Sequence, residues 1–184
     1  MLDSLIAYHC APALAGIKPA NIFSCRKSEY PELHRELRDL NMSFNKKDIY
    51  FEILCECEKR ALVMIYRRNR LSEQLEAPEI RKLLSDHGYP ESAGPDDMLS
   101  VLRTRIAESP EFPHEIGAFL GYPIEDIYGF IDHKNENCLY TGYWRVYGDV
   151  EKCKECFRRY DICRNVILKR LERGHSLAGI FCAA

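Results

Sequence analysis

The chain has 184 residues, of which 46% are hydrophobic and 29% are charged, and its formal net charge is −2 at pH 7. A chain of this length can bury roughly 70% of its unfolded surface in one core without disulfide cross-links. The composition excludes a strong whole-molecule attraction to nucleic acid or anionic lipid, and no apolar run reaches the roughly 20 residues that span a bilayer.

The first half of the chain predicts two helices, one extended segment and a hairpin. A helix begins at Asp3 and ends before Gly16, with Pro12 as a point where it kinks or ends early. Residues 17–25 predict a strand, and residues 31–42 predict a helix from the spacing of their leucines. Two segments rich in aromatic and β-branched residues flank a polar loop at 56–60, which predicts a hairpin over 49–66.

The second half is mostly helical. Proline near the start and glycine at the end indicate a helix over 78–87, and further helices follow from 95, at 113–121 and at 124–131. The aromatic segment 139–147 predicts a strand, and a long helix follows over 149–173. We therefore expect one α+β domain over residues 1–184, in which six or more helices pack on a small, mainly antiparallel sheet.

Two segments far apart in the sequence each place a histidine beside a second metal-binding or nucleophilic group. They are His9–Cys10 and His114–Glu115. Zinc or iron needs several such donors at short range, so these four residues are the candidate metal ligands, with His133 or Cys138 as a further ligand. The spacing matches no recognised metal motif. The alternative is that Cys10 is a buried small hydrophobe and His114 bonds locally at a helix start.

A second candidate is a pocket for a small cofactor. Lys18 and Arg145 offer cations for a phosphate or carboxylate, and Tyr122 and Trp144 offer flat faces for a flavin, a haem or another ring. Small-ligand pockets are usually apolar with a few placed polar groups, and this set has that character. The alternative is tight packing of aromatic side chains around glycines in the core.

Thiol chemistry is a third candidate. The chain has nine cysteines, an odd number that argues against a complete disulfide framework and favours a strongly reducing cytoplasm. Cys10 is a candidate nucleophile, with His114 as base and Glu115 or Asp126 orienting it. Cys153 and Cys156 suggest a redox dithiol, or a four-thiolate zinc site together with Cys55 and Cys57. The alternative is that these thiols share the buried stripe of the last helix.

Nucleic-acid binding is not expected. The helix over 149–173 carries eight Lys or Arg against five Asp or Glu, but the preferred interpretation of this pattern is a solvated helix face over an aromatic core. The helix-turn-helix-like corner at 113–131 lacks the cations that contact phosphates and bases.

Several phrases of the sequence together resemble one family. They are His9-Cys10-Ala11-Pro12 with Gly16-Ile17-Lys18-Pro19, Phe112-Pro113-His114-Glu115-Ile116-Gly117 with Phe119-Leu120-Gly121-Tyr122-Pro123, and Gly142-Tyr143-Trp144-Arg145. The family is an uncharacterised domain of unknown function from anaerobic Firmicutes, mostly clostridia. The resemblance implies a stand-alone cytoplasmic protein of an anaerobe and supplies no reaction or ligand. Cys55, Cys57, Cys153, Cys156 and Cys163 lie outside these phrases.

These observations favour a small-cofactor or metal-binding protein of anaerobic metabolism, with a pocket between the His9–Cys10 segment and the helix start at His114–Glu115. A thiol- or His-dependent enzyme and a partner-binding module without chemistry are the alternatives, so enzymatic activity is left open. Asp3 and the absence of Lys or Arg in residues 1–5 argue against a secretory leader. We therefore expect a cytoplasmic protein that has no membrane association, and the sequence does not indicate its oligomeric state.

Overall fold

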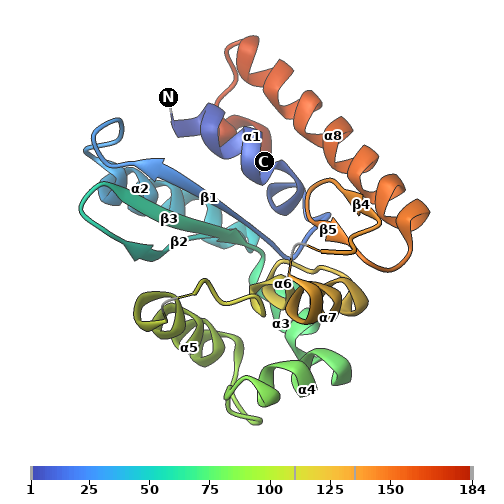
Figure 1. Ribbon diagram of the computed structural model, residues 1–184. Coiled ribbons are helices and arrows are strands. Elements are labelled where there is room, and N and C mark those ends of the chain that lie inside the picture. The colour runs from blue at the N-terminus through green and yellow to red at the C-terminus, as the bar shows by residue number, and fades with distance from the viewer. Residues whose placement is uncertain (1, 110, 135, 183–184) are drawn as a thin grey trace. The chain divides into compact units, whose positions relative to one another are not determined.

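The computed structural model describes residues 2–109, 111–134 and 136–182. In these residues nine α-helices accompany a three-stranded and a two-stranded antiparallel sheet, so the fold is α+β as predicted (Figure 1). The chain divides into two compact units, unit 1 with Met1–Leu71 and Ile162–Ala184, and unit 2 with Ser72–Asp161. The expectation of one domain stays a prediction. None of the described helices is long and apolar enough to cross a membrane.

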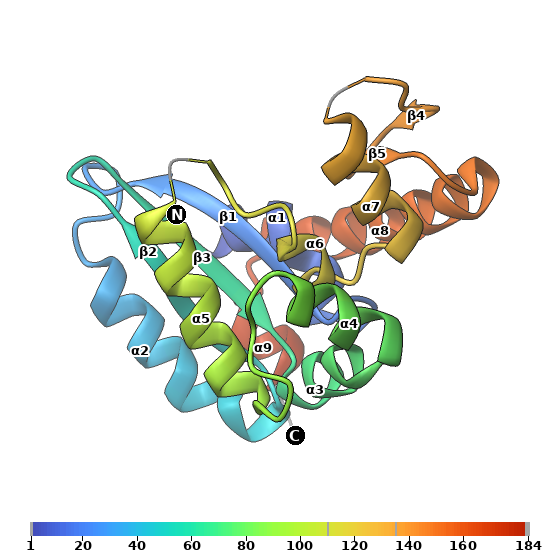
Figure 2. The same cartoon turned by 60° about the horizontal axis from the view of Figure 1, so that its bottom comes forward.

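Unit 1 is built on the three-stranded sheet. Its elements are α1 (Leu2–Leu14), β1 (Ala20–Arg26), α2 (Leu33–Phe44), a 3-10 turn η1 (Asn45–Lys47), β2 (Tyr50–Glu56), β3 (Arg60–Tyr66) and α9 (Leu177–Phe181). The strand order is β1-β3-β2, with β3 in the centre (Figure 2). Ala20 of β1 and Tyr50 of β2 both lie opposite Tyr66, and the register shifts between Ile53 and Cys55. The predicted hairpin and the predicted first strand are confirmed.

The core of unit 1 follows from the period of two in its strands. Phe23 and Cys25 of β1 alternate with Ser24 and Arg26, and Val63 and Ile65 of β3 are likewise two residues apart, so that these side chains share one face. The helices α1 and α2 contribute further residues to the same buried cluster, among them Ile6, Cys10, Leu14, Leu33 and Leu37. Burial of each large side chain stabilises the fold by roughly 1.5–3 kcal/mol.

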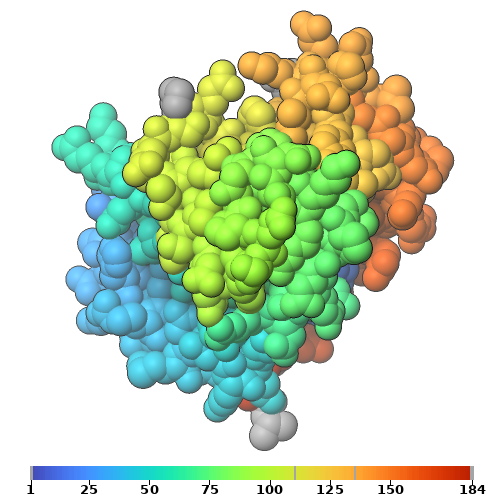
Figure 3. Space-filling view, turned by 90° about the horizontal axis from the view of Figure 1, so that it is seen from below, coloured from blue at the N-terminus to red at the C-terminus, as the bar shows by residue number. Residues whose placement is uncertain are grey.

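Unit 2 is mostly helical. Its complete elements are α4 (Pro78–Asp86), α5 (Pro95–Glu108), α6 (Ile116–Phe119), α7 (Ile124–His133), β4 (Tyr140–Thr141) and β5 (Arg145–Val146). Both α4 and α5 begin with proline, whose fixed φ suits the first helical turn. Their surfaces, green and yellow-green, face the viewer in Figure 3. Two helices belong to both units, α3 (Arg68–Glu76) and α8 (Val150–Glu172).

Three predicted elements differ in detail from the structure. The segment 139–147 forms two short strands, because the chain turns back at Gly142, whose N–H donates to the carbonyl of Trp144 at 3.0 Å. The helix predicted over 113–121 is reduced to Ile116–Phe119, with isolated turns before it. Helix α1 continues through Pro12 to Leu14, and the helices α3 and α9 were not predicted.

Arg67 fixes the end of α1 in unit 1. Its guanidinium donates to the carbonyls of Ala13 at 3.2 Å, Leu14 at 2.5 Å and Lys47 at 3.1 Å. The last carbonyls of a helix have no partner within that helix, so Arg67 supplies the missing donors at this point. Burial lowers the pKa of Arg67, yet a guanidinium stays protonated at neutral pH.

We expect Arg67→Met to lower the free energy of unfolding by about 2–4 kcal/mol, because three carbonyls lose a charged donor while the aliphatic stem is kept. Urea unfolding followed by far-UV circular dichroism measures this change. Arg70→Met, at an exposed position on the same turn, is the matched control and should change stability by less than about 0.5 kcal/mol. If both substitutions lower the free energy of unfolding equally, the hydrogen bonds of Arg67 do not stabilise the end of α1.

Candidate functional site

Unit 2 contains a cavity of about 360 Å³ between α6, α7 and the β4–β5 turn. Most of its lining is aromatic, with Phe112, His114, Tyr122, Phe130, Tyr143 and Trp144. Ile116, Gly117 and Ile127 complete the apolar surface, and Asp126 and Arg145 are its charged members. Four of the residues that the sequence proposed as site residues, namely His114, Tyr122, Trp144 and Arg145, therefore line one cavity.

Asp126 organises this cavity. It lies in the first turn of α7 and is only 2% exposed. Its Oδ1 accepts hydrogen bonds from the backbone N–H groups of Tyr147 at 2.7 Å and Gly148 at 2.9 Å. Its Oδ2 accepts from the indole Nε1 of Trp144 at 2.7 Å and from the thiol of Cys153 at 3.5 Å. The carboxylate thus ties α7 to the turn that carries Trp144 and to the start of α8.

The aromatic walls are held in defined orientations. The rings of Tyr122 and Trp144 stack with their centroids 4.6 Å apart, and the rings of His114 and Phe130 meet edge to face at 4.8 Å. Burial raises the pKa of Tyr122 to about 12, so that its phenol is neutral at physiological pH. A neutral, largely apolar wall of this kind is suited to a flat ring.

Arg145 brings a positive charge to the cavity. Its Nη1 lies 3.6 Å from the Sγ of Cys138, and Thr141 Oγ1 lies 3.7 Å from the same sulfur. These hydrogen bonds, that of Thr141 first and that of Arg145 second, lower the pKa of the Cys138 thiol. A guanidinium beside an apolar cavity can pair with a carboxylate or phosphate on a ligand.

Two of the glycines in this unit serve ring packing. A Cβ on Gly129 would lie 2.4 Å from the ring of Tyr147, and a Cβ on Gly142 would lie 2.2 Å from the ring of Phe157. Both glycines therefore allow an aromatic side chain to lie directly on the backbone. The close-packing interpretation of the sequence applies at these two positions, whereas Gly117 borders the cavity.

Glu115, a proposed metal ligand, is engaged within unit 2. It is 1% exposed, and its Oε1 accepts from Arg105 Nε at 2.5 Å and from the Tyr89 hydroxyl at 3.3 Å. Burial first, and the charge of Glu115 second, raise the pKa of Tyr89. In the part of the chain that the structure describes, no group of three or more His, Cys, Asp or Glu side chains could hold a metal ion.

The other proposed residues, His9, Cys10 and Lys18, lie in unit 1. Cys10 is fully buried, and burial raises the pKa of its thiol well above the ordinary range, which disfavours the thiolate that a nucleophile needs. His9 is exposed, and partial desolvation followed by the charge of Arg164 lowers its pKa. Lys18 is 2% exposed. The shared site between the His9–Cys10 and His114–Glu115 segments stays a prediction.

The two cysteines of the proposed dithiol, Cys153 and Cys156, differ in burial. Cys153 is 3% exposed, and burial followed by the charge of Asp126 raises its pKa to about 12, whereas Cys156 is half-buried. All nine cysteines are free thiols. Cys153 therefore acts in the structure as a donor to a buried carboxylate. Cys55 and Cys57 belong to unit 1, and the four-thiolate zinc site stays a prediction.

Sequence reasoning missed the organising role of Asp126 and the cavity positions Ile127 and Phe130. Their spacing on α7 carries a weak signal, since Ile127 and Phe130 are three residues apart and share a helix face. The partners of Asp126 lie 18 to 27 residues away in sequence, and no local pattern reports them.

The comparisons with known proteins give one match. The model of a family described as protein of unknown function (DUF3793) matches residues 6–181. No curated protein matches the chain, and no solved structure does.

Asp126→Asn should destabilise unit 2 by about 2–4 kcal/mol, because the new amide cannot accept both from the indole of Trp144 and from two backbone N–H groups. Trp144 is the sole tryptophan of the chain, so its fluorescence during urea unfolding measures the effect. Asp132→Asn, at an exposed position on the same helix, is the matched control and should be neutral. If Asp126→Asn leaves the free energy of unfolding unchanged, the carboxylate of Asp126 does not organise unit 2.

The shifted thiol pKa values predict an order of alkylation at pH 7.5. Cys138 and the exposed Cys57 should react first with iodoacetamide, because hydrogen bonds lower the pKa of both thiols and so increase their thiolate fraction. Cys10 and Cys153 should react at least tenfold more slowly, since burial raises their pKa. Time-resolved peptide mass spectrometry measures the order, and early modification of Cys10 would contradict it.

Proposed function

Because this chain belongs to the DUF3793 family of proteins of unknown function, we propose its function from its own site: it binds a small, flat, anionic molecule in the aromatic cavity of unit 2. The observation that carries the proposal is the convergence of His114, Tyr122, Trp144 and Arg145 on one cavity. The first and last of these four residues, His114 and Arg145, lie 31 positions apart in the sequence. A purely apolar core would not place a guanidinium among them.

The size and lining of the cavity support a compact ligand. Ligand sites usually enclose about 300–1,000 Å³ and are mainly apolar with a few polar groups, and the cavity of about 360 Å³ lies at the lower end of that range. A molecule with one or two fused rings suits this volume better than a haem. The stacked rings of Tyr122 and Trp144 give the ligand an apolar aromatic wall, and the indole N–H is directed to Asp126.

Arg145 gives the proposed ligand its charge. Its neighbour Cys138 is a weak hydrogen-bond acceptor, so a carboxylate or phosphate would be a stronger partner for the guanidinium. Asp126 does not compete for this cation, since its two oxygens already accept four hydrogen bonds. The cavity should therefore prefer an anionic ring compound, such as a flavin fragment or an aromatic carboxylate, to a neutral one.

A thiol-dependent enzyme is the second candidate function, and one observation favours it at a residue other than Cys10. Cys138 has a lowered pKa and lies beside Arg145, which lines the cavity. A thiolate there would be next to the anion-binding end of a bound ligand. We also propose a cytoplasmic location and an anaerobic source, which the cysteine content and the family resemblance of the sequence support.

Two fluorescent probes test the proposal. 8-Anilinonaphthalene-1-sulfonate carries an aromatic system and an anion, and N-phenyl-1-naphthylamine has the same rings without the anion. Both should bind the native protein with energy transfer from Trp144, the one tryptophan. Arg145→Met should weaken the sulfonate probe about tenfold, which is roughly 1.4 kcal/mol, and leave the neutral probe within twofold.

The control is Arg159→Met, which removes the same charge from an exposed position of α8 and should affect neither probe. If the two arginine variants weaken the sulfonate probe equally, a general charge effect accounts for binding. If neither probe takes energy from Trp144 in the native protein, the cavity is not a ligand site.

A further inference from the structure

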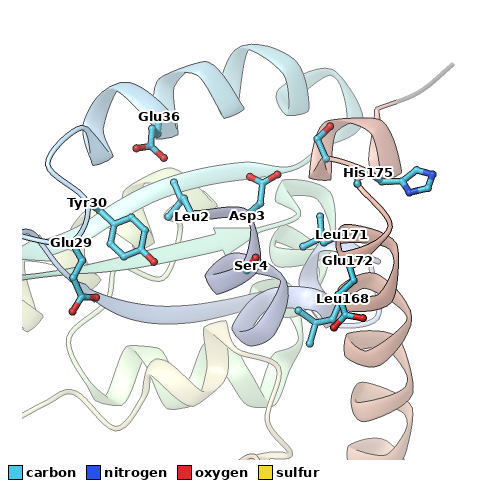
Figure 4. A pocket seen from close by; sticks show the side chains of 12 residues that line it. Leu2, Asp3, Ser4, Glu29, Tyr30, Glu36, Leu168, Leu171, Glu172 and His175 are labelled. Atoms are coloured by element: carbon cyan, nitrogen blue, oxygen red, sulfur yellow. The ribbon is translucent and has the colours of Figure 1, made fainter.

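Unit 1 contains a larger groove that shares no residue with the cavity of unit 2. Its volume is about 1040 Å³, and it is lined by the start of α1, the loop between β1 and α2, the first turn of α2 and the end of α8 with the loop that follows (Figure 4). This volume reaches the upper end of what small-molecule sites enclose, about 300–1,000 Å³. Its size favours a segment of polypeptide as occupant.

The floor of the groove is apolar. Leu2 of α1, Leu168 and Leu171 of α8 and the ring of Tyr30 line it. Leu2 is buried, whereas Leu168, Leu171 and Tyr30 are half-buried and leave apolar surface accessible within the groove. Leucines from two helices beside an aromatic ring form the type of surface that receives the apolar face of a helix.

The charged residues that line the groove are all acids. Asp3, Glu29, Glu36 and Glu172 line it, and neither lysine nor arginine does. Asp3 accepts from the backbone N–H of Leu177 at 3.1 Å, and the exposed Glu29 pairs with Arg26 at 3.2 Å. Glu36 and Glu172 form no ion pair with any residue that the structure describes. Figure 4 shows the side chain of Glu36 directed toward Leu2, while the ring of His175 points outward.

The carboxylates of the groove also affect the pKa of the tyrosine that lines it. Burial raises the pKa of Tyr30, and the carboxylates of Glu29 and Glu36 raise it further, as expected where negative charge gathers. This groove is acidic although unit 1 carries 16 Lys or Arg against 10 Asp or Glu, so the negative charge is a local property.

We propose that this groove is a docking site for a basic amphipathic helix of a partner protein, whose apolar side chains contact Leu2, Leu168 and Leu171 and whose Lys or Arg side chains pair with Glu36 and Glu172. Charge complementarity selects this occupant. An acidic or neutral helix would leave the unpaired carboxylates of Glu36 and Glu172 beside an apolar surface without a cation.

A second copy of the chain is a less suitable occupant of the groove than a helix of a partner protein. Exposed Ile162 and Val166 of α8, with Lys169, Arg170 and Arg173, form a face that is itself basic and amphipathic. At about 100° per residue, every residue of this face lies at least about 100° around the helix from Leu168 and Leu171. Pairing of one copy's face with another's groove would therefore be head to tail and would build rings or open chains rather than a closed dimer.

Two synthetic peptides test the proposal by fluorescence anisotropy with the full chain. The first is a labelled helix of Leu and Lys with Leu at every third and fourth position, and the second has Glu in place of Lys. The Leu/Lys peptide should bind more weakly as salt rises, and the Leu/Glu peptide should not bind. The paired substitution Glu36→Lys with Glu172→Lys should weaken the Leu/Lys peptide at least tenfold.

Two further variants keep the result interpretable. Glu36→Gln with Glu172→Gln removes the charges without repulsion and should weaken binding several-fold, even if the lysine pair folds poorly. Glu73→Lys with Glu108→Lys makes the same charge change at exposed positions of α3 and α5 and should leave binding unchanged. If this control weakens binding of the Leu/Lys peptide equally, the peptide binds through the net charge of the protein and not through the groove.

Other outcomes would overturn the proposal as well. The groove is not a docking site for this class of helix if the Leu/Lys peptide fails to bind or if the Leu/Glu peptide binds as tightly. Sedimentation velocity of the chain alone adds an independent test. A salt-sensitive oligomer that the Glu36→Lys, Glu172→Lys pair dissolves would assign the groove to a second copy.

Discussion

The buried carboxylate of Asp126 accepts hydrogen bonds from an indole, two backbone amides and a thiol. Moving an isolated carboxylate out of water costs several kcal/mol, so this charge is tolerated only while its donors are in place. Those donors come from the β4–β5 turn, the segment after β5 and the start of α8. The requirement to satisfy one charge therefore fixes three segments against α7. One of them, the β4–β5 turn, forms the aromatic cavity together with α6 and α7.

Unit 1 uses a guanidinium in a comparable way. Arg67 donates to Ala13 and Leu14 at the end of α1 and to Lys47. The apolar cluster supplies most of the stabilisation in this unit, but hydrophobic contacts are not directional. The hydrogen bonds of Arg67 define where α1 ends relative to the turn before β2. In both units a charged side chain thus gives specificity to a fold that apolar burial stabilises.

The charged residues are distributed unevenly between the two units. A net charge of −2 conceals a basic unit 1 and an acidic unit 2, in which 10 Lys or Arg face 18 Asp or Glu. The groove of unit 1 is acidic within its basic surroundings, and Arg145 is a cation within the acidic unit. The groove therefore carries the sign opposite to that of its unit, and the cavity offers one cation beside the hydrogen-bonded Asp126. A local charge of this kind contributes to selecting a partner.

The sequence by itself determined the types of most elements and singled out four of the eleven residues that line the cavity. The hairpin over 49–66, the helices begun by proline and the aromatic segment around Trp144 and Arg145 have local signals, because side-chain period and turn chemistry act within a few residues. Only the tertiary structure decided that Glu115 pairs with Arg105, that Cys10 is sealed in a core, and that Asp126 joins distant segments. These outcomes depend on contacts between residues far apart in the chain, and the free energy of burying a charge or a thiol is set by the neighbours that folding brings to it.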